Sequence, residues 1–302
     1  MNSPDDDPFA KLRVMQLALS FERDCVRALL SADATQNGTR ARKAFAPGSS
    51  PARQWLDAVE LAGELCHRSA IETAQLERAV VAFPSPLAAG VVLEDAHFQA
   101  WRGYDLARGI REYLGVANVA AFSNIEAKSR FEVRFGALQS LETFLLVDIG
   151  ERIESWARIG TFDIRGTHVG EQIIERDGAM DGWGRRGSLN AYCSDEAFEG
   201  RAQSYGLGGN TPAQVFEMAS SNFAAQSLCD EFCARLAQGI SNAVTMLNGA
   251  PVCVSGPIVR QAWPLLWPRL EPFLKAMWPP QAAFAIFPAK GDDDSALWGA
   301  LS

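Results

Sequence analysis

Two β-hairpins, each followed by alternating helices and strands, constrain the fold of this chain more than any other feature of its sequence. Residues 12–20 and 25–31 are rich in Val and Leu and flank a tight polar turn, which predicts the first hairpin. Residues 142–150 and 152–160 repeat the pattern. Strands that alternate with helices pair in parallel within an α/β sheet. The sequence therefore predicts an α/β protein with two related lobes and a cleft between them.

The same pattern divides the chain into a tail and two lobes. Residues 1–12 form a polar tail, residues 13–115 an N-terminal α/β lobe, and residues 116–290 a C-terminal α/β lobe with long helices. Gly115 ends a helical pattern and marks the expected boundary between the lobes. We expect the last helix, within residues 291–302, to complete the N-terminal lobe.

Capping residues and apolar repeats locate several helices. Ser50 followed by Pro51 predicts a helix start, and Thr211 with Gln214 forms a capping box. Residues 34–50, ahead of the first of these helices, have the composition of a loop. A four-residue apolar repeat predicts one long helix with a buried face. Its members are Ala224, Leu228, Phe232, Leu236, Ile240, Val244 and Leu247.

Charge and hydropathy exclude two classes of partner. The formal net charge is -8 and acidic and basic residues are interspersed, so no basic stripe can follow a phosphate backbone. No apolar run approaches the roughly 20 residues that a membrane span requires, and the acidic N-terminus is unlike a signal peptide. We therefore expect a cytoplasmic protein without a direct nucleic-acid or membrane partner. Its six cysteines lack the spacing of a disulfide scaffold and should be reduced and mostly buried.

Several stretches of the chain follow one set of family motifs in collinear order. "FSNIEAKSRFEVRFGA" has the spacing of N-D-x-N-x-x-x-x-x-E-x-x-x-G-A, "GEQIIERDG" that of G-H-x-x-V-x-x-D-G, and "GWGRRGSLNAYCS" that of G-C-G-N-R-G-C-L-E-A-Y-x-S. These stretches resemble the ROK family of repressors, unassigned reading frames and sugar kinases. The resemblance implies the two-lobed fold of the hexokinase and actin-like ATPase superfamily, of the ribonuclease H-like kind, with ATP and a sugar meeting in the cleft.

The catalytic position implied by this resemblance has changed. In ROK kinases an Asp acts as general base on the sugar hydroxyl, and the matching residue is Asn124, preceded by Ser123 in place of an Asn. An amide cannot take that proton, and losing a general base slows a reaction by about 10²- to 10⁴-fold. Glu126 is a weak substitute because a helix turns it away from Asn124 by roughly 200°. Asp148, which ends a strand, is the better substitute and could hold Mg²⁺.

The sugar contacts implied by the resemblance also fall on exchanged residues. The family Asn ahead of the G-W pair is His97, the Glu before the G-H pair is His168, and the Glu of C-L-E is Asn190. With Ser123 and Asn124, these residues define a candidate substrate pocket that holds a different ligand or none. The alternative is that they are only polar residues in a cleft that has drifted.

The family's zinc loop keeps its glycines and loses its ligands. One His and three Cys bind zinc in the family, whereas the matching residues here are Glu171, Asp181, Trp183 and Ser188. An indole cannot ligate zinc, and a serine hydroxyl is a poor zinc ligand. We expect a loop without zinc, supported by packing of Trp183 and by charged contacts from Arg185 or Arg186.

The first phosphate-binding turn implied by the resemblance is degenerate as well. Kinases of this superfamily hold phosphates and Mg²⁺ with a D-x-G-G-T turn, because glycines let backbone N–H groups approach closely. Here Ala18 replaces the Asp, while Ser20, Phe21 and Glu22 occupy the last three positions. Neither the Mg²⁺ ligand nor the glycines remain.

The remaining nucleotide motifs are only partly kept. The second phosphate loop begins at Gly150 but carries Glu151 and Glu154. Each carboxylate facing a polyphosphate would cost about 1–4 kcal/mol at contact distance. The Gly-Gly of the adenosine-side motif is Ser255-Gly256, so one glycine survives.

Simultaneous damage to the base, the Mg²⁺ turn, the second phosphate loop and the zinc ligands favours a ROK-fold protein without phosphotransfer activity. Such a protein would bind a sugar, regulate another process or bind a partner, with no cofactor and no zinc. The alternative is a divergent but active carbohydrate kinase that uses Mg-ATP on a hexose or N-acetylhexosamine. A DNA-binding repressor is disfavoured because about a dozen residues precede the first strand, too few for a helix-turn-helix domain.

Oligomerisation is also implied by the resemblance, since ROK proteins commonly form dimers. We expect a homodimer or a hetero-oligomer. The tryptophan-rich segment 263–278 either contributes an interface or packs the C-terminal lobe.

Overall fold

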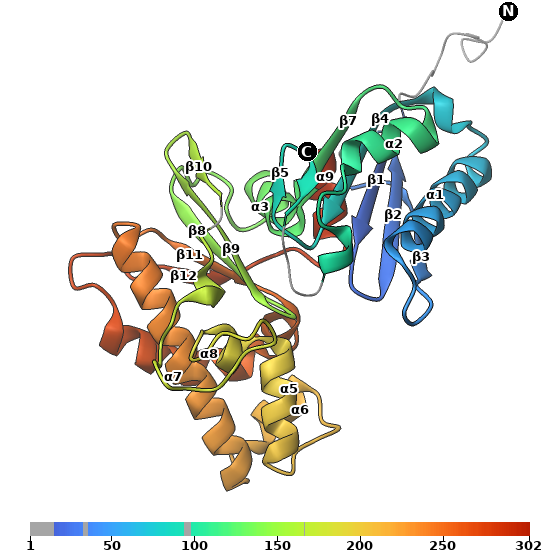
Figure 1. The fold of residues 1–302 in the computed structure, drawn as a ribbon. Helices are drawn as coiled ribbons and strands as arrows, with labels where there is room; N and C mark the ends of the chain where they lie inside the picture. The colour runs from blue at the N-terminus through green and yellow to red at the C-terminus, as the bar shows by residue number, and fades with distance from the viewer. Residues whose placement is uncertain (1–14, 33–35, 94–97, 166) are drawn as a thin grey trace, which may run out of the picture. The chain divides into compact units, whose positions relative to one another are not determined.

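Each of the two predicted hairpins opens a five-stranded mixed sheet. The computed structural model describes residues 15–32, 36–93, 98–165 and 167–302, so the expected tail lies outside the described residues. Unit 1 runs to Phe131 and resumes at Asp293, and unit 2 comprises Glu132–Asp292 (Figure 1). The α/β class predicted from the sequence is confirmed.

The sheet of unit 1 has the strand order β3-β2-β1-β4-β7. Its strands are β1 (Met15–Phe21), β2 (Cys25–Ser31), β3 (Thr39–Ala44), β4 (Leu76–Phe83) and β7 (Val119–Ser123), and β5 (Leu87–Ala88) pairs separately with β6 (Val91–Val92). β1 and β2 are antiparallel, whereas β4 pairs in parallel with both β1 and β7. Because β7 belongs to this sheet, the boundary expected at Gly115 falls inside unit 1.

Strand β3 contradicts the sequence interpretation. The composition of residues 34–50 predicts a loop, but Thr39–Ala44 pair antiparallel with β2. Arg40, Arg42 and Lys43 are charged, as side chains on an edge strand commonly are, because charge there opposes pairing with other chains. The strand therefore lacks the apolar run that would reveal it in the sequence.

The described residues of unit 1 form four helices and two short 3₁₀ turns around its sheet. They are α1 (Pro51–Arg68), η1 (Thr73–Gln75), η2 (Gln99–Trp101), α2 (Leu106–Leu114), α3 (Asn124–Arg134, whose end enters unit 2) and α9 (Ser295–Leu301). Ser50 Oγ accepts a hydrogen bond from the Arg53 amide at 3.3 Å, which confirms the predicted cap of α1. Helix α9 packs on β1, β2 and β4. A Cβ at Gly299 would lie 1.7 Å from the Ala127 carbonyl oxygen, so α9 and α3 meet at a glycine.

The sheet of unit 2 has the strand order β10-β9-β8-β11-β12. Its strands are β8 (Phe144–Ile149), β9 (Ile153–Ile159), β10 (Phe162–Ile164), β11 (Val252–Ser255) and β12 (Ile286–Pro288). β8 and β9 form the second predicted hairpin, and β11 pairs in parallel with β8 and β12. The helices are η3 (Val169–Glu171), α4 (Asn190–Cys193), α5 (Asp195–Ser204), α6 (Pro212–Met218), α7 (Phe223–Met246) and α8 (Pro257–Met277).

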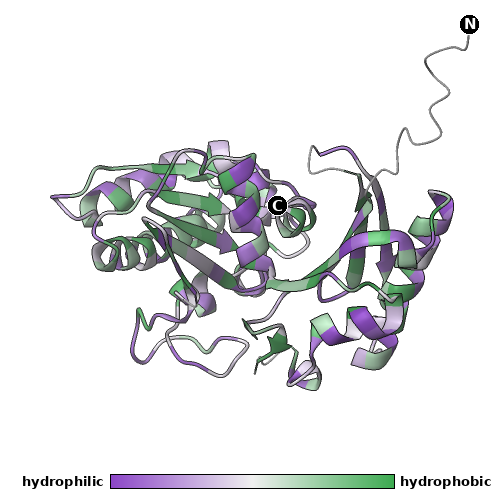
Figure 2. Cartoon of the chain, turned by 90° about the horizontal axis from the view of Figure 1, so that it is seen from above, coloured by the Kyte–Doolittle hydropathy of each residue, from purple (hydrophilic) through white to green (hydrophobic). Residues whose placement is uncertain are grey.

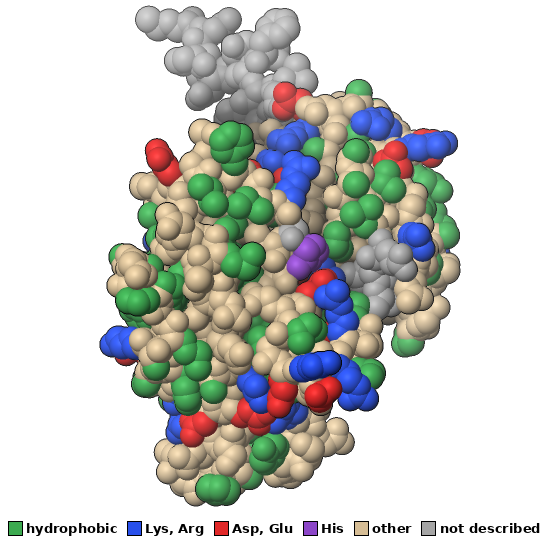
Figure 3. Space-filling model, turned by 60° about the vertical axis from the view of Figure 1, so that its left-hand side comes forward, with side chains coloured by type: hydrophobic (Ala, Val, Ile, Leu, Met, Phe, Trp, Pro, Cys, Tyr) green, Lys and Arg blue, Asp and Glu red, His purple; other side chains and the backbone are tan. Residues whose placement is uncertain are grey.

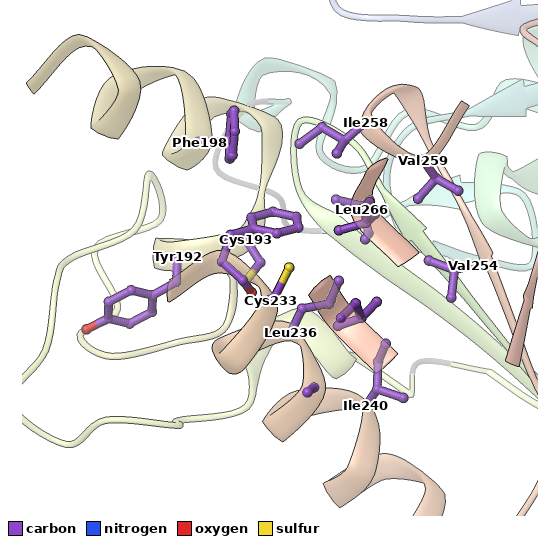
Figure 4. Close-up of a cluster of buried hydrophobic side chains, with 14 of the residues drawn as sticks. Tyr192, Cys193, Phe198, Cys233, Leu236, Ile240, Val254, Ile258, Val259 and Leu266 are labelled. Carbon is purple, nitrogen blue, oxygen red and sulfur yellow. The ribbon is translucent and has the colours of Figure 1, made fainter. Parts of the chain in front are cut away.

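The core of unit 2 forms where α7 and α8 pack on each other and α8 packs on the sheet. Figure 4 shows Cys193, Phe198, Leu236 and Val254 from α4, α5, α7 and β11 converging in this core. The apolar repeat predicted for α7 is buried from residue 228 to residue 244, while its two end members are half-buried. Apolar residues likewise gather on the strands and on the inner helix faces in Figure 2.

Helix α8 carries the tryptophan-rich segment. The rings of Trp263 and Trp267 stack with centroids 5.2 Å apart, and Trp278 meets Phe284 edge-on at 4.9 Å. All three tryptophans are half-buried and pack against the core of unit 2. These contacts favour the expectation that the tryptophans pack the C-terminal part of the chain.

The surface is mixed in charge. Lys and Arg side chains are interspersed with Asp and Glu on the face shown in Figure 3, with single apolar side chains between them. Within the described ranges, no helix has both the length and the apolar composition for a bilayer span.

The six cysteines should be unreactive in the native protein. All are free and buried, and burial raises the pKa of the Cys25 and Cys229 thiols to about 12. A pKa four units above the solution pH leaves roughly one thiol in 10⁴ as the reactive thiolate. We expect no modification by a disulfide reagent at about pH 8 within minutes, and modification of all six in denaturant. Two or more fast-reacting native thiols would contradict this burial.

Glu132 is the first residue of unit 2, and its side chain binds the segment by which the chain leaves this unit. The buried carboxylate accepts hydrogen bonds from the amides of Ala137 at 2.6 Å, Lys290 at 3.2 Å and Gly291 at 2.6 Å. A Cβ at Gly136 would lie 2.0 Å from Glu132 Oε2. The glycine therefore leaves the space that this carboxylate occupies.

Candidate functional site

Phe21, at a glycine position of the first phosphate turn, is a core residue. It ends β1 and is 1% exposed. Its ring stacks on Trp55 with centroids 5.6 Å apart and contacts Phe83 and Trp101 at 5.5 Å and 5.4 Å. The neighbouring Ser20 is buried within β1. The turn is therefore held by an aromatic cluster instead of presenting open glycines.

Glu22, at the threonine position of that turn, has its charge matched. Arg27 Nε lies 2.8 Å from a Glu22 oxygen, and Arg27 also pairs with Asp294 at 3.4 Å. Glu22, Asp24 and Cys25 bring ligand-type atoms within 4.8 Å of one another. Arg42 donates to Cys25 Sγ at 3.1 Å and pairs with Asp24 at 3.3 Å. The group fits an ion-pair network better than a metal.

Asn124, at the general-base position, begins α3 and is 8% exposed. Its Nδ2 donates to the Phe21 carbonyl oxygen at 3.1 Å. Its Oδ1 is buried, and no described residue donates to it. Ser123 Oγ accepts from the Glu126 amide at 3.3 Å, and Glu126 pairs with Arg130 at 3.2 Å. Asn124 thus ties the phosphate turn to α3 and keeps one free acceptor.

Ser85 is a polar residue of this edge that sequence reasoning missed. β4 and β7 pair in parallel with Phe83 opposite Ser123, so Ser85 and Asn124 both follow the carboxyl ends of neighbouring strands. Ser85 Oγ is fully buried and has no hydrogen-bond partner among the described residues. The signal in the sequence is the Ser that separates two prolines in "PSP".

In unit 2, Asp148 and Ser255 form a buried pair. They are register partners at the carboxyl ends of β8 and β11, and Ser255 Oγ donates to Asp148 Oδ1 at 2.5 Å. Asp148 is only 3% exposed. Gly256 has φ +113°, and a Cβ there would lie 1.9 Å from the Ile149 carbonyl oxygen. The surviving glycine is thus required by the backbone, and the Asp148 carboxylate is bound by a hydroxyl.

The segment that matches the family's second phosphate loop contains an ion pair. Arg152 lies 3.1 Å from Glu154, and both side chains are largely buried. The Arg152 guanidinium also lies over the Trp183 ring at 5.9 Å. The Gly150 amide donates to the Arg152 carbonyl oxygen at 3.2 Å. Arg152 therefore neutralises Glu154, which lowers the repulsion that this carboxylate would exert on a polyphosphate.

The positions matching the zinc ligands bind protein atoms. Glu171 pairs with Arg185 at 2.8 Å, which confirms the predicted support from Arg185. Asp181 Oδ2 accepts from Ser188 Oγ at 2.5 Å, and its Oδ1 accepts from the amides of Trp183 and Arg185, both at 2.9 Å. Two engaged carboxylates, a hydroxyl and an indole do not fit the nitrogen and sulfur donor set of structural zinc.

Two of the predicted sugar contacts, His168 and Asn190, lie in unit 2 and differ in environment. His168 is half-exposed with φ +45°, and its Nδ1 lies 3.6 Å from Glu171 Oε1. Asn190 is 3% exposed, and its Oδ1 accepts from the Ile153 amide at 2.7 Å. His97 lies outside the described residues. Asn190 and His168 thus belong to unit 2, whereas Ser123 and Asn124 belong to unit 1.

The model of the ROK family matches residues 35–302, which contain all of these motifs except the first phosphate turn at residues 18–22. The chain belongs to the ROK family. No curated protein matches its sequence.

Solved structures of ROK proteins share its fold. A ROK hexokinase from Thermus thermophilus has a TM-score of 0.75 at 18% identity, over 95% of this chain and 96% of that chain. A ROK family glucokinase from Streptomyces griseus, in complex with glucose and AMPPNP, has 0.76 at 18%, over 95% and 98%. A ROK family transcriptional regulator, a homologue of the E. coli MLC protein, has 0.80 at 16%, over 96% and 77%. Kinases and a regulator thus share this fold.

The loop from Glu171 to Ser188, which carries the positions matching the family's zinc ligands, should be stable without metal. We expect a chelator to leave the melting temperature unchanged, because hydrogen bonds to Asp181 hold the loop. Asp181→Ala should lower the free energy of unfolding by about 1–3 kcal/mol, since it removes three hydrogen bonds to a carboxylate. Thermal denaturation with and without EDTA measures both effects.

The exposed Asp177 of the same loop supplies the control. Asp177→Ala should change the stability by less than about 0.5 kcal/mol. A clear fall of the melting temperature in EDTA would show that this loop depends on a metal after all.

Proposed function

We propose that this ROK protein binds a carbohydrate without phosphorylating it, and acts as a regulatory or partner-binding protein. The observation that carries the proposal is the hydrogen bond from Asn124 Nδ2 to the Phe21 carbonyl oxygen, 3.1 Å long. It joins the base position and the phosphate turn, the two elements that a ROK kinase uses for catalysis, in one structural contact.

The chemistry left at Asn124 is recognition rather than proton transfer. Oδ1 can accept a hydrogen bond from a sugar hydroxyl, but an amide is too weak a base to take its proton. The buried Ser85 hydroxyl at the same sheet edge can both donate and accept. Buried polar groups without partners are rare in native proteins and call for a ligand or an ordered water.

The nucleotide-side residues support the same proposal. Phe21 fills the turn with a core side chain, and Asp148 accepts the Ser255 hydroxyl. Neither arrangement offers Mg-ATP an open carboxylate or a glycine-lined turn. The alternative, a divergent kinase, requires Asp148 to release Ser255 and take over as base or Mg²⁺ ligand.

Titration calorimetry tests the proposal. We expect heat from glucose or N-acetylglucosamine and none from millimolar Mg-ATP. Micromolar binding of Mg-ATP that strengthens with a hexose would instead support the kinase, and Asp148→Asn should then abolish turnover. Heat from none of these compounds would overturn carbohydrate binding itself.

Restoring the base should not restore a kinase. In Asn124→Asp a carboxylate oxygen replaces Nδ2 and faces the Phe21 carbonyl oxygen, so one buried hydrogen bond becomes a repulsion. We expect a loss of about 1–3 kcal/mol in unfolding free energy and no phosphorylation of hexoses. Urea denaturation and a coupled ADP assay measure the two. Measurable turnover with unchanged stability would contradict the structural role given to Asn124.

We also propose that the protein works in the cytoplasm as a homodimer or hetero-oligomer, without nucleic acid, membrane or zinc. Membership of the ROK family supports the oligomer, the mixed surface charge supports the absence of nucleic acid, and the exchanged ligand positions from Glu171 to Ser188 support the absence of zinc. Light scattering after size exclusion measures the assembly, and a monomer at all concentrations would argue against the homodimer.

A further inference from the structure

We infer that the outer face of helix α8 binds a second copy of this chain, with the two helices antiparallel. The inference rests on the homodimer proposed above and specifies the surface that forms it. The inner face of α8 packs on α6, α7 and the sheet of unit 2. Figure 4 shows Ile258 and Leu266 of this helix within that core. The face on the other side of the helix is the one available to a partner.

The outer face of α8 carries an apolar ridge. Its members are the four exposed residues between Gln261 and Lys275, namely Pro264, Leu265, Pro268 and Pro272. At 3.6 residues per turn they lie within about 100° of one another around the helix axis. Charged and polar side chains are typical of an exposed helix face, and a helix whose outer face is also apolar is normally covered. The ridge therefore has the composition of a covered surface.

Prolines suit a surface that becomes covered on assembly. Burying a proline costs no side-chain rotamer entropy, so the ridge loses little freedom when a partner covers it. Each proline inside a helix also removes the N–H that would bond the carbonyl four residues earlier. The carbonyl oxygens of Arg260, Pro264 and Pro268 therefore lack that donor within α8. They follow the same side of the helix and can accept hydrogen bonds from a partner's side chains.

The charges beside the ridge favour a second copy as the partner. Arg260 and Glu271 are eleven residues apart, which is about three helical turns and leaves them about 20° apart on one flank of the ridge. Two-fold symmetry brings this flank against the same flank of an antiparallel copy. Arg260 of each copy then faces Glu271 of the other. Glu271 bonds Lys275 of its own helix at 2.9 Å, and a carboxylate can accept from both cations.

Leu265 stands at the centre of this arrangement. It lies midway between Arg260 and Glu271 along the helix and is 37% exposed. In a two-fold arrangement, a residue midway between two mutually paired positions lies next to the axis and faces its own copy. Leu265 of one copy should therefore contact Leu265 of the other.

Sedimentation velocity over a series of protein concentrations tests this inference. We expect the unmodified chain to form a dimer. Leu265→Glu places two carboxylates side by side at the two-fold axis, so the dissociation constant of the dimer should rise at least about a hundredfold. Met246→Glu makes the same kind of change on α7, at a residue that is 85% exposed, and should alter the constant by less than about twofold. Both variants should fold, because neither side chain is fully buried.

Charge reversal tests the antiparallel arrangement separately. Arg260→Glu sets two glutamates against each other at both symmetric contacts, and Glu271→Arg sets two arginines there. Each variant should raise the dissociation constant about tenfold, because it replaces attraction by repulsion twice in each dimer. The double variant restores opposite charges and should return the constant to within about threefold of the original.

The outcomes separate this inference from the proposed function. A dimer that survives in Leu265→Glu would overturn the assignment of α8 and leave the homodimer standing. Single reversals that the double variant fails to rescue would overturn the antiparallel pairing. A monomer at all concentrations would overturn both the homodimer and this inference, including the case in which a different protein covers the ridge. Carbohydrate binding is measured by calorimetry and stands or falls independently of all three results.

Discussion

Phe21→Gly is expected to unfold much of unit 1 instead of restoring ATP binding. The substitution returns a glycine to the position where ROK kinases bind phosphate, and it removes a ring that stacks on Trp55 and contacts Phe83 and Trp101. Truncating a buried aromatic side chain costs about 3–5 kcal/mol, and glycine within a strand adds roughly 0.5–1 kcal/mol. Total stabilities of proteins are only about 5–15 kcal/mol.

Urea denaturation of three variants isolates the effect. Phe21→Ala removes the ring without the added freedom of glycine, so it should be slightly less destabilising than Phe21→Gly. Phe223→Ala, at a phenylalanine that is 83% exposed, should change stability by less than about 0.5 kcal/mol. A folded Phe21→Gly protein that binds Mg-ATP would show that phosphate binding was lost by a single reversible substitution.

The sequence predicted what depends on neighbours along the chain. The caps at Ser50 and Thr211 are formed as expected, because each bonds an amide three residues away. The two hairpins and the buried face of α7 also follow from local spacing. Family motifs added the fold of the whole chain, since they fix the order of elements that periodicity alone leaves open.

The sequence did not predict contacts between distant residues. Asn124 meets Phe21 across 103 positions, and Ser255 meets Asp148 across 107. Spacing carries no information about such pairs, so the interpretation of Asp148 as an available substitute base omitted the hydroxyl that binds it. The ion pair between Arg152 and Glu154 was missed for another reason. The sequence interpretation considered the two glutamates of this loop and not the arginine that stands between them.

Glu132→Ala is expected to lower the free energy of unfolding by about 3 kcal/mol or more. The variant leaves three amides without an acceptor, and each hydrogen bond to a charged group contributes about 1.5–3 kcal/mol. The amides of Lys290 and Gly291 belong to the returning segment, so its local opening should become easier. Hydrogen exchange at these two amides, followed alongside urea denaturation, measures the local and global effects.

Two further variants keep this test decisive if Glu132→Ala does not fold. Glu132→Gln keeps one acceptor oxygen, so its free energy of unfolding should fall by about half as much as that of Glu132→Ala. Glu126→Ala, on the same helix, removes only the i,i+4 pair with Arg130 and should cost less than about 1 kcal/mol. Unchanged exchange at residues 290 and 291 in Glu132→Gln would refute the role of the carboxylate. Glu132, Gly136 and Ala137 match the ROK motif while Asn124 does not, so the backbone contacts of the motif are kept and its general-base residue is exchanged.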